Sequence, residues 1–415
     1  MSANATHVIV GGGQAGGRAA EAMRAAGFAG RIVCFAGEPE RPYERPPLSK
    51  GVLTGDAPES AAYLREPTYY TDNGIEVRTG APVEAIDRAA RRVVLEDGTD
   101  LAYDRLLLAT GARVKRLPVP GADLGGVHYL RTLADSRDLR DALTEGARVA
   151  IVGGGYIGLE VAAAAAKRGC AVTVLEGAAA VMGRQLPAEL GTWFAAQHRA
   201  RGIDVVTGAQ VAAFEARGDA SGRVGAVRCA DGTHKPADVV VVGVGVAPAT
   251  ELAEQAGLAC DDGIVVDTQG RTSDPAVFAA GDVTRHPNPV LGRTIRLESW
   301  QNAQYQAEAA GRTMAGVPTA YRMVPWFWSD QFDLNLQMVG VPESWDRLVW
   351  RGEPDPEAGF AVFCLADGVV VGASAVNLGK AVAPARKLLE SGARPDPAAL
   401  ADPGTSLKKV LKGAG

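Results

Sequence analysis

Residues 149–162 decide the fold, and they read VAIVGGGYIGLEVA. A run of β-branched residues ends in glycines and passes directly into a helix rich in alanine, the setting that gives a G-x-G-x-x-G pattern its meaning. Gly153 makes the tight turn, Gly155 lets the backbone approach a pyrophosphate, and Gly158 lets the helix pack on the strand. The expected ligand is therefore a dinucleotide whose phosphates lie at the helix N-terminus.

The same pattern stands at the start of the chain. A predicted strand at residues 7–10 leads into Gly11, Gly13 and Gly16, and a helix of small residues is expected over residues 17–26. One such match is weak evidence. Two matches in one chain indicate two dinucleotide sites.

An internal repeat extends beyond the two glycine motifs. Residues 74–81 read GIEVRTGA, and residues 202–209 read GIDVVTGA. Asp-Gly hairpin signals follow at 97–98 and 231–232, and each is followed at the same interval by a glycine that closes a buried strand. The sequence therefore predicts an α/β protein with two duplicated Rossmann-like dinucleotide-binding domains, each a parallel sheet interrupted by an antiparallel meander.

Three domains are expected. The first covers residues 1–112 and 246–320, the second covers 113–245, and a C-terminal α+β domain covers 321–415. Further predicted elements are a helix at 304–314, aromatic strands at 325–331, 336–340 and 347–350, a hairpin at 367–368, a helix at 384–389 and a loop at 394–403.

Composition limits the classes of partner. The chain has 415 residues, 47% of them hydrophobic and 22% charged, with a net charge of -5, which is typical of a globular protein and gives no reason to expect nucleic acid or an anionic membrane as partner. The first strand begins too early for a signal peptide, and no apolar run reaches transmembrane length. We expect a cytoplasmic protein.

Cysteine and histidine give no sign of a reactive site. The cysteines are odd in number, widely separated and never in C-x-x-C spacing, so we expect buried, reduced thiols and no metal site. The histidines are expected to be ordinary surface or core residues. These residues are Cys34, Cys170, Cys229, Cys260 and Cys364, and His7, His128, His198, His234 and His286.

Several motifs occur together and in order. They are the first glycine motif, RPPLSK at 45–50, LATG at 108–111, GGGYIGLE at 153–160, TSDP at 272–275 with AGD at 280–282, and PWFWSDQ at 325–331. Over essentially the whole chain this set resembles the NADH-dependent ferredoxin reductases of bacterial oxygenase systems. The resemblance implies a glutathione-reductase-like fold with FAD on the first copy, NADH on the second, and a C-terminal domain covering the flavin.

An acidic residue about 20 residues after each glycine motif is expected to bind a ribose, and Glu38 and Glu176 stand there. The resemblance implies the other site residues. The positions for FAD are Gly11, Gly13, Ala15, Gly16, Gly37, Glu38, Arg45, Lys50, Val83, Ala109, Thr110, Gly111, Arg131, Gly281, Asp282 and Trp300. Those for NADH are Gly153, Gly155, Tyr156, Ile157, Gly158, Glu160, Glu176 and Gly245. Lys50 and Glu160 are expected to pair beside the flavin and the nicotinamide as the catalytic residues, and the indole of Trp300 has no interpretation.

The function implied is transfer of electrons from NADH through FAD to a 2Fe-2S ferredoxin that serves a haem-thiolate monooxygenase, by a monomer or weak homodimer. Because Glu176 would repel a 2′-phosphate, NADH should be preferred, although Arg184 could weaken the preference. Since the net charge is negative, docking of an acidic ferredoxin needs a local basic patch. The candidates are Trp328 as the aromatic contact and the basic residues Arg65, Lys380, Arg386, Lys387, Lys408, Lys409 and Lys412.

Other interpretations remain open. The reductase component of a Rieske dioxygenase and a rubredoxin reductase share all the motifs. A flavin-carrying scaffold like apoptosis-inducing factor keeps the same folds, but it typically adds targeting sequences and long basic insertions. A thiol-dependent NADH peroxidase or disulfide reductase needs a cysteine soon after the first glycine motif, where residues 43–46 read YERP.

Overall fold

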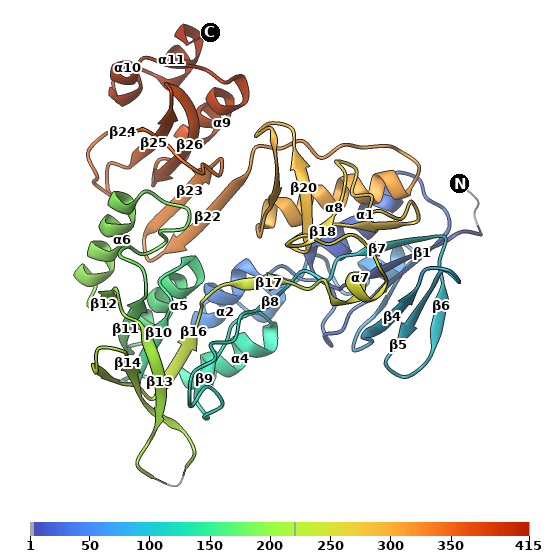
Figure 1. The fold of residues 1–415 in the computed structure, drawn as a ribbon, viewed down its shortest axis with the longest axis horizontal. Helices are drawn as coiled ribbons and strands as arrows, with labels where there is room; N and C mark the ends of the chain where they lie inside the picture. Colours follow the sequence, from blue (N-terminus) through green and yellow to red (C-terminus); the bar gives the residue numbers. More distant parts are fainter. Residues whose placement is uncertain (1–3, 220, 415) are drawn as a thin grey trace. The chain divides into compact units, whose positions relative to one another are not determined.

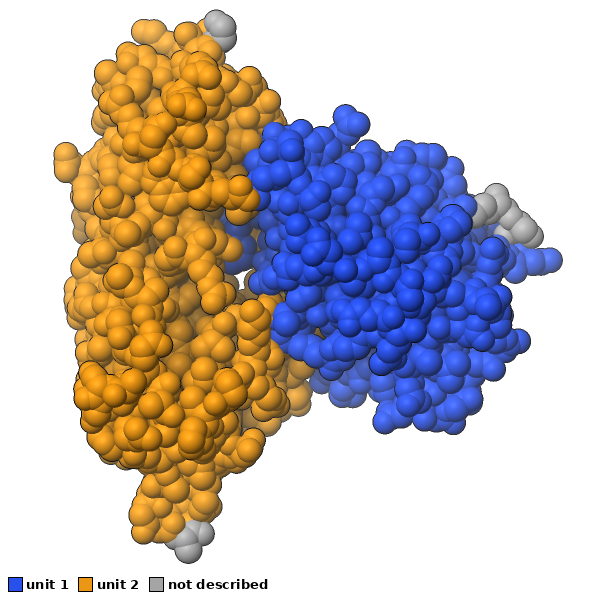
Figure 2. All heavy atoms as spheres, viewed as in Figure 1, with its two compact units in different colours: residues 1–44, 62–113, 247–327 blue, residues 45–61, 114–246, 328–415 orange. Residues whose placement is uncertain are grey.

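The computed structural model describes residues 4–219 and 221–414. The chain forms two compact units (Figure 2). Unit 1 consists of Met1–Glu44, Ala62–Arg113 and Ala247–Phe327, and unit 2 of Arg45–Ala61, Val114–Val246 and Trp328–Gly415. Each unit is described by itself below.

The core of unit 1 is a parallel sheet with the strand order β19-β7-β1-β2-β3. Its central strand β1 has neighbours on both sides and is buried from His7 to Val10, which explains the apolar run at Val8, Ile9 and Val10. The strands are β1 Thr6–Val10, β2 Arg31–Phe35, β3 Ile75–Arg78, β7 Arg105–Leu108 and β19 Val277–Ala279.

Two helices, α1 Gln14–Ala25 and α8 Trp300–Met314, pack against each other in unit 1. A Cβ on Gly311 would lie 2.5 Å from the carbonyl oxygen of Ala19, so only glycine permits this close approach. Both helices begin earlier than predicted. The helix expected at 304–314 begins at Trp300, because the hydroxyl of Ser299 accepts a hydrogen bond from the backbone of Asn302.

The core of unit 2 is a second parallel sheet, with the order β12-β11-β10-β16-β9. Read from β3 and from β12, the two sheets have the same arrangement, which confirms the duplicated fold. Only the origin of the last strand differs, because β19 comes from downstream in the chain and β9 from upstream. The elements are β9 Val127–His128, β10 Arg148–Val152, β11 Ala171–Glu176, β12 Asp204–Thr207, β16 Val239–Val242, α4 Leu133–Ala142, α5 Tyr156–Lys167 and α6 Ala188–Ala200.

Each copy also contains the predicted antiparallel meander. Gly98 and Gly232 both have positive φ, 78° and 85°, as the two Asp-Gly hairpins require. The strands are β4 Val83–Asp87, β5 Arg92–Leu95 and β6 Asp100–Ala102 in unit 1, and β13 Val211–Ala216, β14 Val224–Cys229 and β15 His234–Pro236 in unit 2.

A third sheet contains the C-terminal strands, in the order β22-β23-β26-β25-β24 (Figure 1). Asp367 and Gly368 form the predicted hairpin between β25 and β26, both with positive φ. The strands are β22 Trp326–Gln331, β23 Leu334–Val339, β24 Arg347–Arg351, β25 Phe360–Ala366 and β26 Val369–Val376. The predicted strands agree with β22 and β24 to within one residue, whereas β23 begins two residues before the predicted position.

Three helices pack beside this sheet: α9 Val382–Ser391 on β26, α10 Pro397–Ala401 on β24, and α11 Leu407–Gly413 on α9. The loop predicted at 394–403 is wrong in its middle, which forms α10. The reason is local: the side chain of Asp396 accepts a hydrogen bond from the backbone of Ala398, and Pro397 occupies the first helical position. The helix predicted at 384–389 corresponds to α9, which is longer than predicted by about a turn.

The remaining elements are short. They are the helical turns η1 Pro46–Ser49, α2 Gly51–Thr54, η2 Glu59–Ala62, α3 Tyr69–Asp72, α7 Glu251–Gln255 and η3 Gly379–Ala381, and the strands β8 Ala112–Val114, β17 Val246–Pro248, β18 Ile264–Val265, β20 Thr284–Asn288 and β21 Arg293–Arg296. Within residues 4–219 and 221–414, none of the helices has the length and apolar character needed to cross a bilayer.

Candidate dinucleotide sites and a buried carboxylate

The first glycine motif forms a cradle at the end of β1. A Cβ on Gly11 would lie 2.1 Å from the carbonyl oxygen of Ala109, and one on Gly16 would lie 1.9 Å from that of Gly11, so both glycines are required by packing. A Cβ on Gly13, by contrast, would meet no atom within 4 Å. The middle glycine therefore faces open space, where a pyrophosphate can approach the backbone.

The second motif repeats this arrangement. A Cβ on Gly153 would lie 2.4 Å from the carbonyl oxygen of Gly243, one on Gly158 would lie 2.0 Å from that of Gly153, and one on Gly155 would meet nothing within 4 Å. Neither α1 nor α5 has a side-chain cap or an acidic residue in its first turn. Their first N–H groups and the helix dipole therefore favour an anion, and both cradles fit a pyrophosphate.

The predicted FAD residues of unit 1 gather at the carboxyl end of its sheet, where ligands of such folds bind. Ala109 and Thr110 follow β7, and Gly281 and Asp282 follow β19. A Cβ on Gly281 would lie 3.0 Å from the Cβ of Ala15, so Gly281, the residue before Asp282, lies beside the N-terminus of α1. Among the other predicted FAD residues of unit 1, Gly111 has positive φ, Gly37 is exposed, and Val83 is half-buried at the start of β4.

The two predicted ribose carboxylates are not at equivalent positions. Glu176 is the last residue of β11, and its counterpart after β2 is Ala36, so Glu38 lies two residues farther on. The buried Tyr43 hydroxyl donates a hydrogen bond to Glu38. Glu176 instead accepts hydrogen bonds from two backbone N–H groups, of Gly154 at 2.6 Å and of Ala178 at 2.7 Å. The second carboxylate is therefore fixed directly by the glycine turn.

The structure also explains the indole of Trp300, which the sequence left without an interpretation. Its indole N–H donates a hydrogen bond to Glu44, and its carbonyl oxygen accepts one from the side chain of Gln14 at 3.3 Å. Gln14 is the first residue of α1, and Trp300 is the first residue of α8. The contacts therefore hold the N-termini of the two helices and the end of the first segment of unit 1 together.

The remaining predicted site residues belong to unit 2. The guanidinium of Arg45 donates to the carbonyl oxygen of Arg131. Gly245 has a φ of 104°, and an added Cβ would lie 3.2 Å from a guanidinium nitrogen of Arg184. The hydroxyl of Tyr156 is 3.0 Å from the sulfur of Met338, and burial raises the pKa of this tyrosine. Ile157, the next residue of α5, is one of the few exposed large hydrophobic residues.

Lys50 and Glu160 form an ion pair in unit 2. The Lys50 Nζ is 2.7 Å from the Glu160 Oε2, which also accepts a hydrogen bond from the Ser49 hydroxyl. The Glu160 Oε1 accepts a hydrogen bond from the Ser329 hydroxyl at 2.6 Å. The side chain of Glu160 is 2% exposed and that of Lys50 is 21% exposed, so the charge on Glu160 is buried and its partner reaches solvent.

Sequence reasoning missed the residues that surround this pair: Ser49, Ser329, Gln331 and His198. A signal was present in residues 326–331, WFWSDQ. Alternation along a strand puts Ser329 and Gln331 on the face opposite Trp328 and Asp330, and Ser329 and Gln331 are both 0% exposed. Buried polar residues opposite half-exposed aromatic ones are unusual and mark a functional region.

The thiols show no sign of activation. Cys34, Cys229 and Cys364 are buried as predicted, but the prediction is wrong for Cys170 and Cys260, which are half-buried near loops. All five are free, and burial raises the pKa of Cys34 and of Cys364 to about 12. A thiol with such a pKa is a poor nucleophile at neutral pH. Across the described residues, no group of His, Cys, Asp and Glu side chains could hold a metal ion.

The predicted docking residues fall in both units. Trp328 is half-buried in β22, and its indole donates to Asp330 at 3.1 Å. The lysines of α9 and α11 and the one before α9 are exposed in unit 2, namely Lys380, Lys387, Lys408, Lys409 and Lys412, whereas Arg386 is half-buried. Arg65 belongs to unit 1 and pairs with Glu21 at 2.8 Å.

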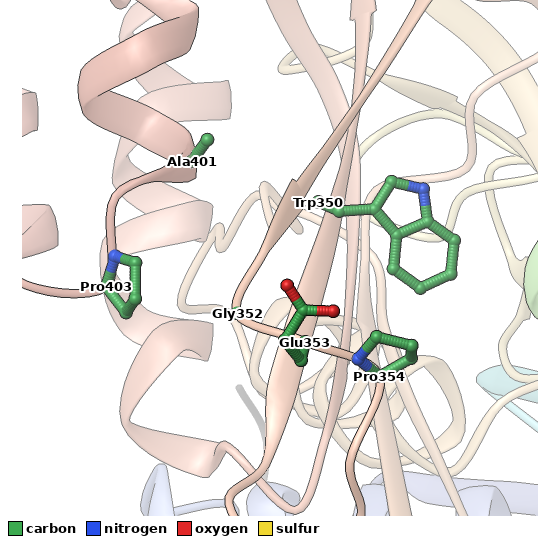
Figure 3. A pocket seen from close by; sticks show the side chains of 6 residues that line it. All are labelled: Trp350, Gly352, Glu353, Pro354, Ala401 and Pro403. Carbon is green, nitrogen blue, oxygen red and sulfur yellow. The ribbon is translucent and has the colours of Figure 1, made fainter.

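A separate pocket of about 450 Å³ lies in the C-terminal part of unit 2. Figure 3 shows Trp350, Glu353 and Pro354 on one side of it and Ala401 and Pro403 on the other. None of these residues was predicted to bind a cofactor. With one carboxylate and no cation in its lining, the pocket does not offer the contacts that a dinucleotide phosphate requires.

Comparison with known proteins agrees with this geometry. The family model described as pyridine nucleotide-disulphide oxidoreductase matches residues 5–307, and the one described as reductase C-terminal matches residues 326–411. A ferredoxin–NAD(+) reductase component of the anthranilate 1,2-dioxygenase system of Burkholderia cepacia is 48% identical, covering 97% of this chain and 98% of its own.

Putidaredoxin reductase of Pseudomonas putida is 40% identical, covering 100% of this chain and 98% of its own. The crystal structure of the covalent putidaredoxin reductase–putidaredoxin complex matches with a TM-score of 0.95 at 39% identity, covering 100% of this chain and 99% of that one. The chain therefore belongs to the pyridine nucleotide-disulphide oxidoreductase family, and within it to the FAD- and NAD(H)-dependent ferredoxin reductases of oxygenase systems.

Proposed function

We propose that the protein accepts electrons from NADH on its second cradle and passes them, through FAD on its first, to a 2Fe-2S ferredoxin. The observation that carries the proposal is the pair of glycine cradles, each with its middle glycine open and its outer glycines closed by packing. When bound, FAD accepts two electrons from a nicotinamide and gives them up one at a time, which neither protein side chains nor NADH can do.

The residues of the chain bind and orient the reactants. In the proposal, the N-termini of α1 and α5 bind the two pyrophosphates, and Glu38 and Glu176 bind the riboses. Asp282 is expected to bind the ribityl chain of the flavin. Lys50 and Glu160 are proposed as the catalytic pair that places a fixed positive and negative charge beside the reacting rings.

A thiol-dependent reaction is an alternative function, and the environment of the cysteines argues against it. Of the thiols, Cys34 is the first after the opening glycine motif, and it lies inside β2 with its pKa raised to about 12 by burial. It is therefore unsuited to the role of the redox cysteine that a peroxidase or disulfide reductase uses.

The class of terminal oxygenase that the protein serves is also proposed. Our first candidate is a haem-thiolate monooxygenase fed through a 2Fe-2S ferredoxin, as the resemblance to the reductase of putidaredoxin suggests. The second candidate is a Rieske dioxygenase, which is supported by the 48% identity with the anthranilate dioxygenase component.

The test is an electron-transfer assay with purified components. We expect NADH to reduce cytochrome c rapidly only when a 2Fe-2S ferredoxin is added. Ferredoxins taken from a haem-thiolate system and from a Rieske system, compared by kcat/KM, should rank the two candidates. Equal rates with and without every ferredoxin would contradict the proposed function and favour a flavin-carrying scaffold.

We further propose three domains with the boundaries given above, a cytoplasmic location, and a monomer or weak homodimer. The match of a separate family model to residues 326–411 supports a C-terminal domain. Use of NADH and five free cysteines support a reducing compartment. Sedimentation velocity across a range of protein concentrations tests the oligomeric state.

A further inference from the structure

Strand β22 is unusual because its most deeply buried side chains are polar. Ser329 and Gln331 are 0% exposed, whereas Trp326, Trp328 and Asp330 all reach solvent in part. Burying an amide and a hydroxyl costs free energy unless each finds hydrogen-bond partners. The inverted pattern therefore calls for partners on the neighbouring elements of unit 2.

Those partners form one continuous chain of hydrogen bonds. The Ser329 hydroxyl lies 2.6 Å from Glu160 Oε1, the Gln331 Nε2 lies 3.1 Å from the Ser329 oxygen, and the His198 Nε2 lies 2.9 Å from Gln331 Oε1. The chain joins α5, β22 and α6. It ends on the carboxylate that pairs with Lys50.

The chemistry of the groups fixes the direction of every bond. An ionised carboxylate only accepts, so Ser329 donates its proton to Glu160 and its oxygen is free to accept from the amide of Gln331. The amide oxygen of Gln331 then accepts from His198, which must carry its proton on Nε2. Burial lowers the pKa of His198, in agreement with a neutral ring. All donors therefore point toward Glu160.

The same groups are unsuited to relaying a proton to Glu160. An amide between Ser329 and His198 does not readily pass a proton, and the Nδ1 of His198 is buried with no hydrogen-bond partner among the described atoms. What the chain does is hold the carboxylate. Ser49 and Lys50 fix Oε2 of Glu160, and Ser329 fixes Oε1.

We propose that Ser329 is a positioning residue for reduction of the flavin by NADH, and that Gln331 acts through it by fixing the direction of its hydroxyl. The proposal rests on the function proposed above. Without the Ser329 hydroxyl, one oxygen of a buried carboxylate loses the hydrogen bond that fixes it, and the carboxylate can rotate away from its place beside Lys50. Small displacements of this kind are known to slow chemical steps strongly.

The experiment is anaerobic stopped-flow reduction of the FAD-loaded protein by NADH. For Ser329→Ala we expect the rate constant at saturating NADH to fall by roughly tenfold or more, while the dissociation constant for NADH changes much less. The same Ala variant should bind NAD+ in titration calorimetry almost as the wild type does. Gln331→Met, which leaves Ser329 in place, should slow reduction by a smaller factor.

The matched control is Ser374→Ala. Ser374 is also a buried serine, on β26 of the same sheet, whereas the described partners of the Glu160 carboxylate are Ser49, Lys50 and Ser329. NADH should reduce the FAD of this variant at the wild-type rate. If Ser329→Ala fails to retain FAD, Ser329→Cys keeps the shape of the side chain and weakens only the donor.

A double-mutant cycle separates positioning from a general structural effect. In a Glu160→Gln background, Ser329→Ala should slow reduction further by less than about twofold, because the group through which it acts is gone. An equal slowing in both backgrounds, or wild-type rates for Ser329→Ala alone, would overturn the proposal. A wild-type protein that NADH does not reduce would instead overturn the proposed function.

Discussion

The two dinucleotide-binding halves share a scaffold but differ one turn into the helix. Gly16 and Gly158 close the two cradles, and the residues two positions later are Arg18 and Glu160. Arg18 pairs with Glu21 of its own helix at 3.0 Å. Glu160 pairs with a lysine 110 positions away in the sequence. Glycine packing thus leaves an open cradle in both halves, and we propose that the side chain beyond it assigns the chemistry.

A second difference lies inside the sheets. His7 of β1 corresponds to Val149 of β10, and both side chains are buried at the centre of a parallel sheet. His7 stacks on Phe28 with ring centroids 3.9 Å apart, an arrangement with no counterpart in the second half. The fold therefore tolerates a titratable group at this position, at a cost that depends on pH.

The largest expected effect comes from making the same change in both cradles. Gly13 and Gly155 have extended backbones and open space around the missing Cβ, so valine is compatible with the fold and fills only the phosphate site. Gly13→Val should purify without FAD absorbance. Gly155→Val should remain yellow but bind NADH about a hundredfold more weakly, through loss of the phosphate contacts.

Absorbance spectra and NADH titrations measure these outcomes, and circular dichroism checks that both variants fold. The comparison fails if each variant loses both cofactors. It fails equally if Gly13→Val keeps its flavin and loses NADH binding.

Next in size is removal of the lysine from the buried ion pair. Lys50→Ala leaves the Glu160 charge buried with hydroxyl partners alone, so it should lower the free energy of unfolding by about 3 kcal/mol and slow flavin reduction or release FAD. The matched control is Lys167→Ala. Lys167 forms a largely exposed pair with Asp56, whose removal should lower the free energy of unfolding far less than loss of the Lys50 pair.

Urea unfolding at matched FAD content measures both variants. Indistinguishable midpoints and equal reduction rates for Lys50→Ala and Lys167→Ala would show that the Lys50 pair has no special role.

Coenzyme preference is the third effect. Glu176 is fixed by the backbone of Gly154 and Ala178, so its charge cannot move away from a 2′-phosphate. Wild-type protein should prefer NADH over NADPH by roughly a hundredfold in kcat/KM, and Glu176→Ala should narrow the ratio to about tenfold. Ferricyanide reduction with both coenzymes measures the ratio. Similar kcat/KM values for the two coenzymes in the wild type would refute the role of Glu176.

A smaller effect concerns the pH dependence of stability. Burial lowers the pKa of His7 to about 4, with Arg105 acting in the same direction. Between pH 6.5 and 4 only the unfolded chain takes up this proton, so stability is complete above pH 6.5 and falls as the pH decreases. His7→Val, which copies the second half, should remove about 2 kcal/mol of the loss between pH 7 and pH 5.

Unfolding curves at both pH values test this expectation. His286, whose pKa burial also lowers to about 4, remains in the variant and should keep part of the acid sensitivity. Identical pH dependence in wild type and His7→Val would show that His7 does not stay neutral in the folded state.

The smallest expected effect is on docking of the ferredoxin. Lys408 and Lys409 are exposed on α11, and replacing both with glutamate should raise the KM for ferredoxin by roughly threefold to tenfold and flatten its salt dependence. Turnover with ferricyanide, which needs no docking surface, should not change. A parallel loss with both acceptors would mean that α11 has a structural role.

Local sequence patterns predicted most elements. The glycine motifs, both meanders and the Asp367 hairpin are where the sequence puts them, because each depends on residues only a few positions apart. The errors are at ends and caps. The start of α8 at Trp300 depends on one serine hydroxyl, and α10 depends on one aspartate, signals that hydrophobic periodicity does not contain.

By itself, the sequence determined the duplicated α/β fold and the two open cradles, because glycine spacing and strand patterns act locally. Only the tertiary structure decided which side chains surround Glu160. Ser49, His198 and Ser329 come from segments far apart in the chain, and they meet because the sheets and helices that carry them pack together. Hydrogen-bond partners across such distances follow from packing, which no local pattern encodes.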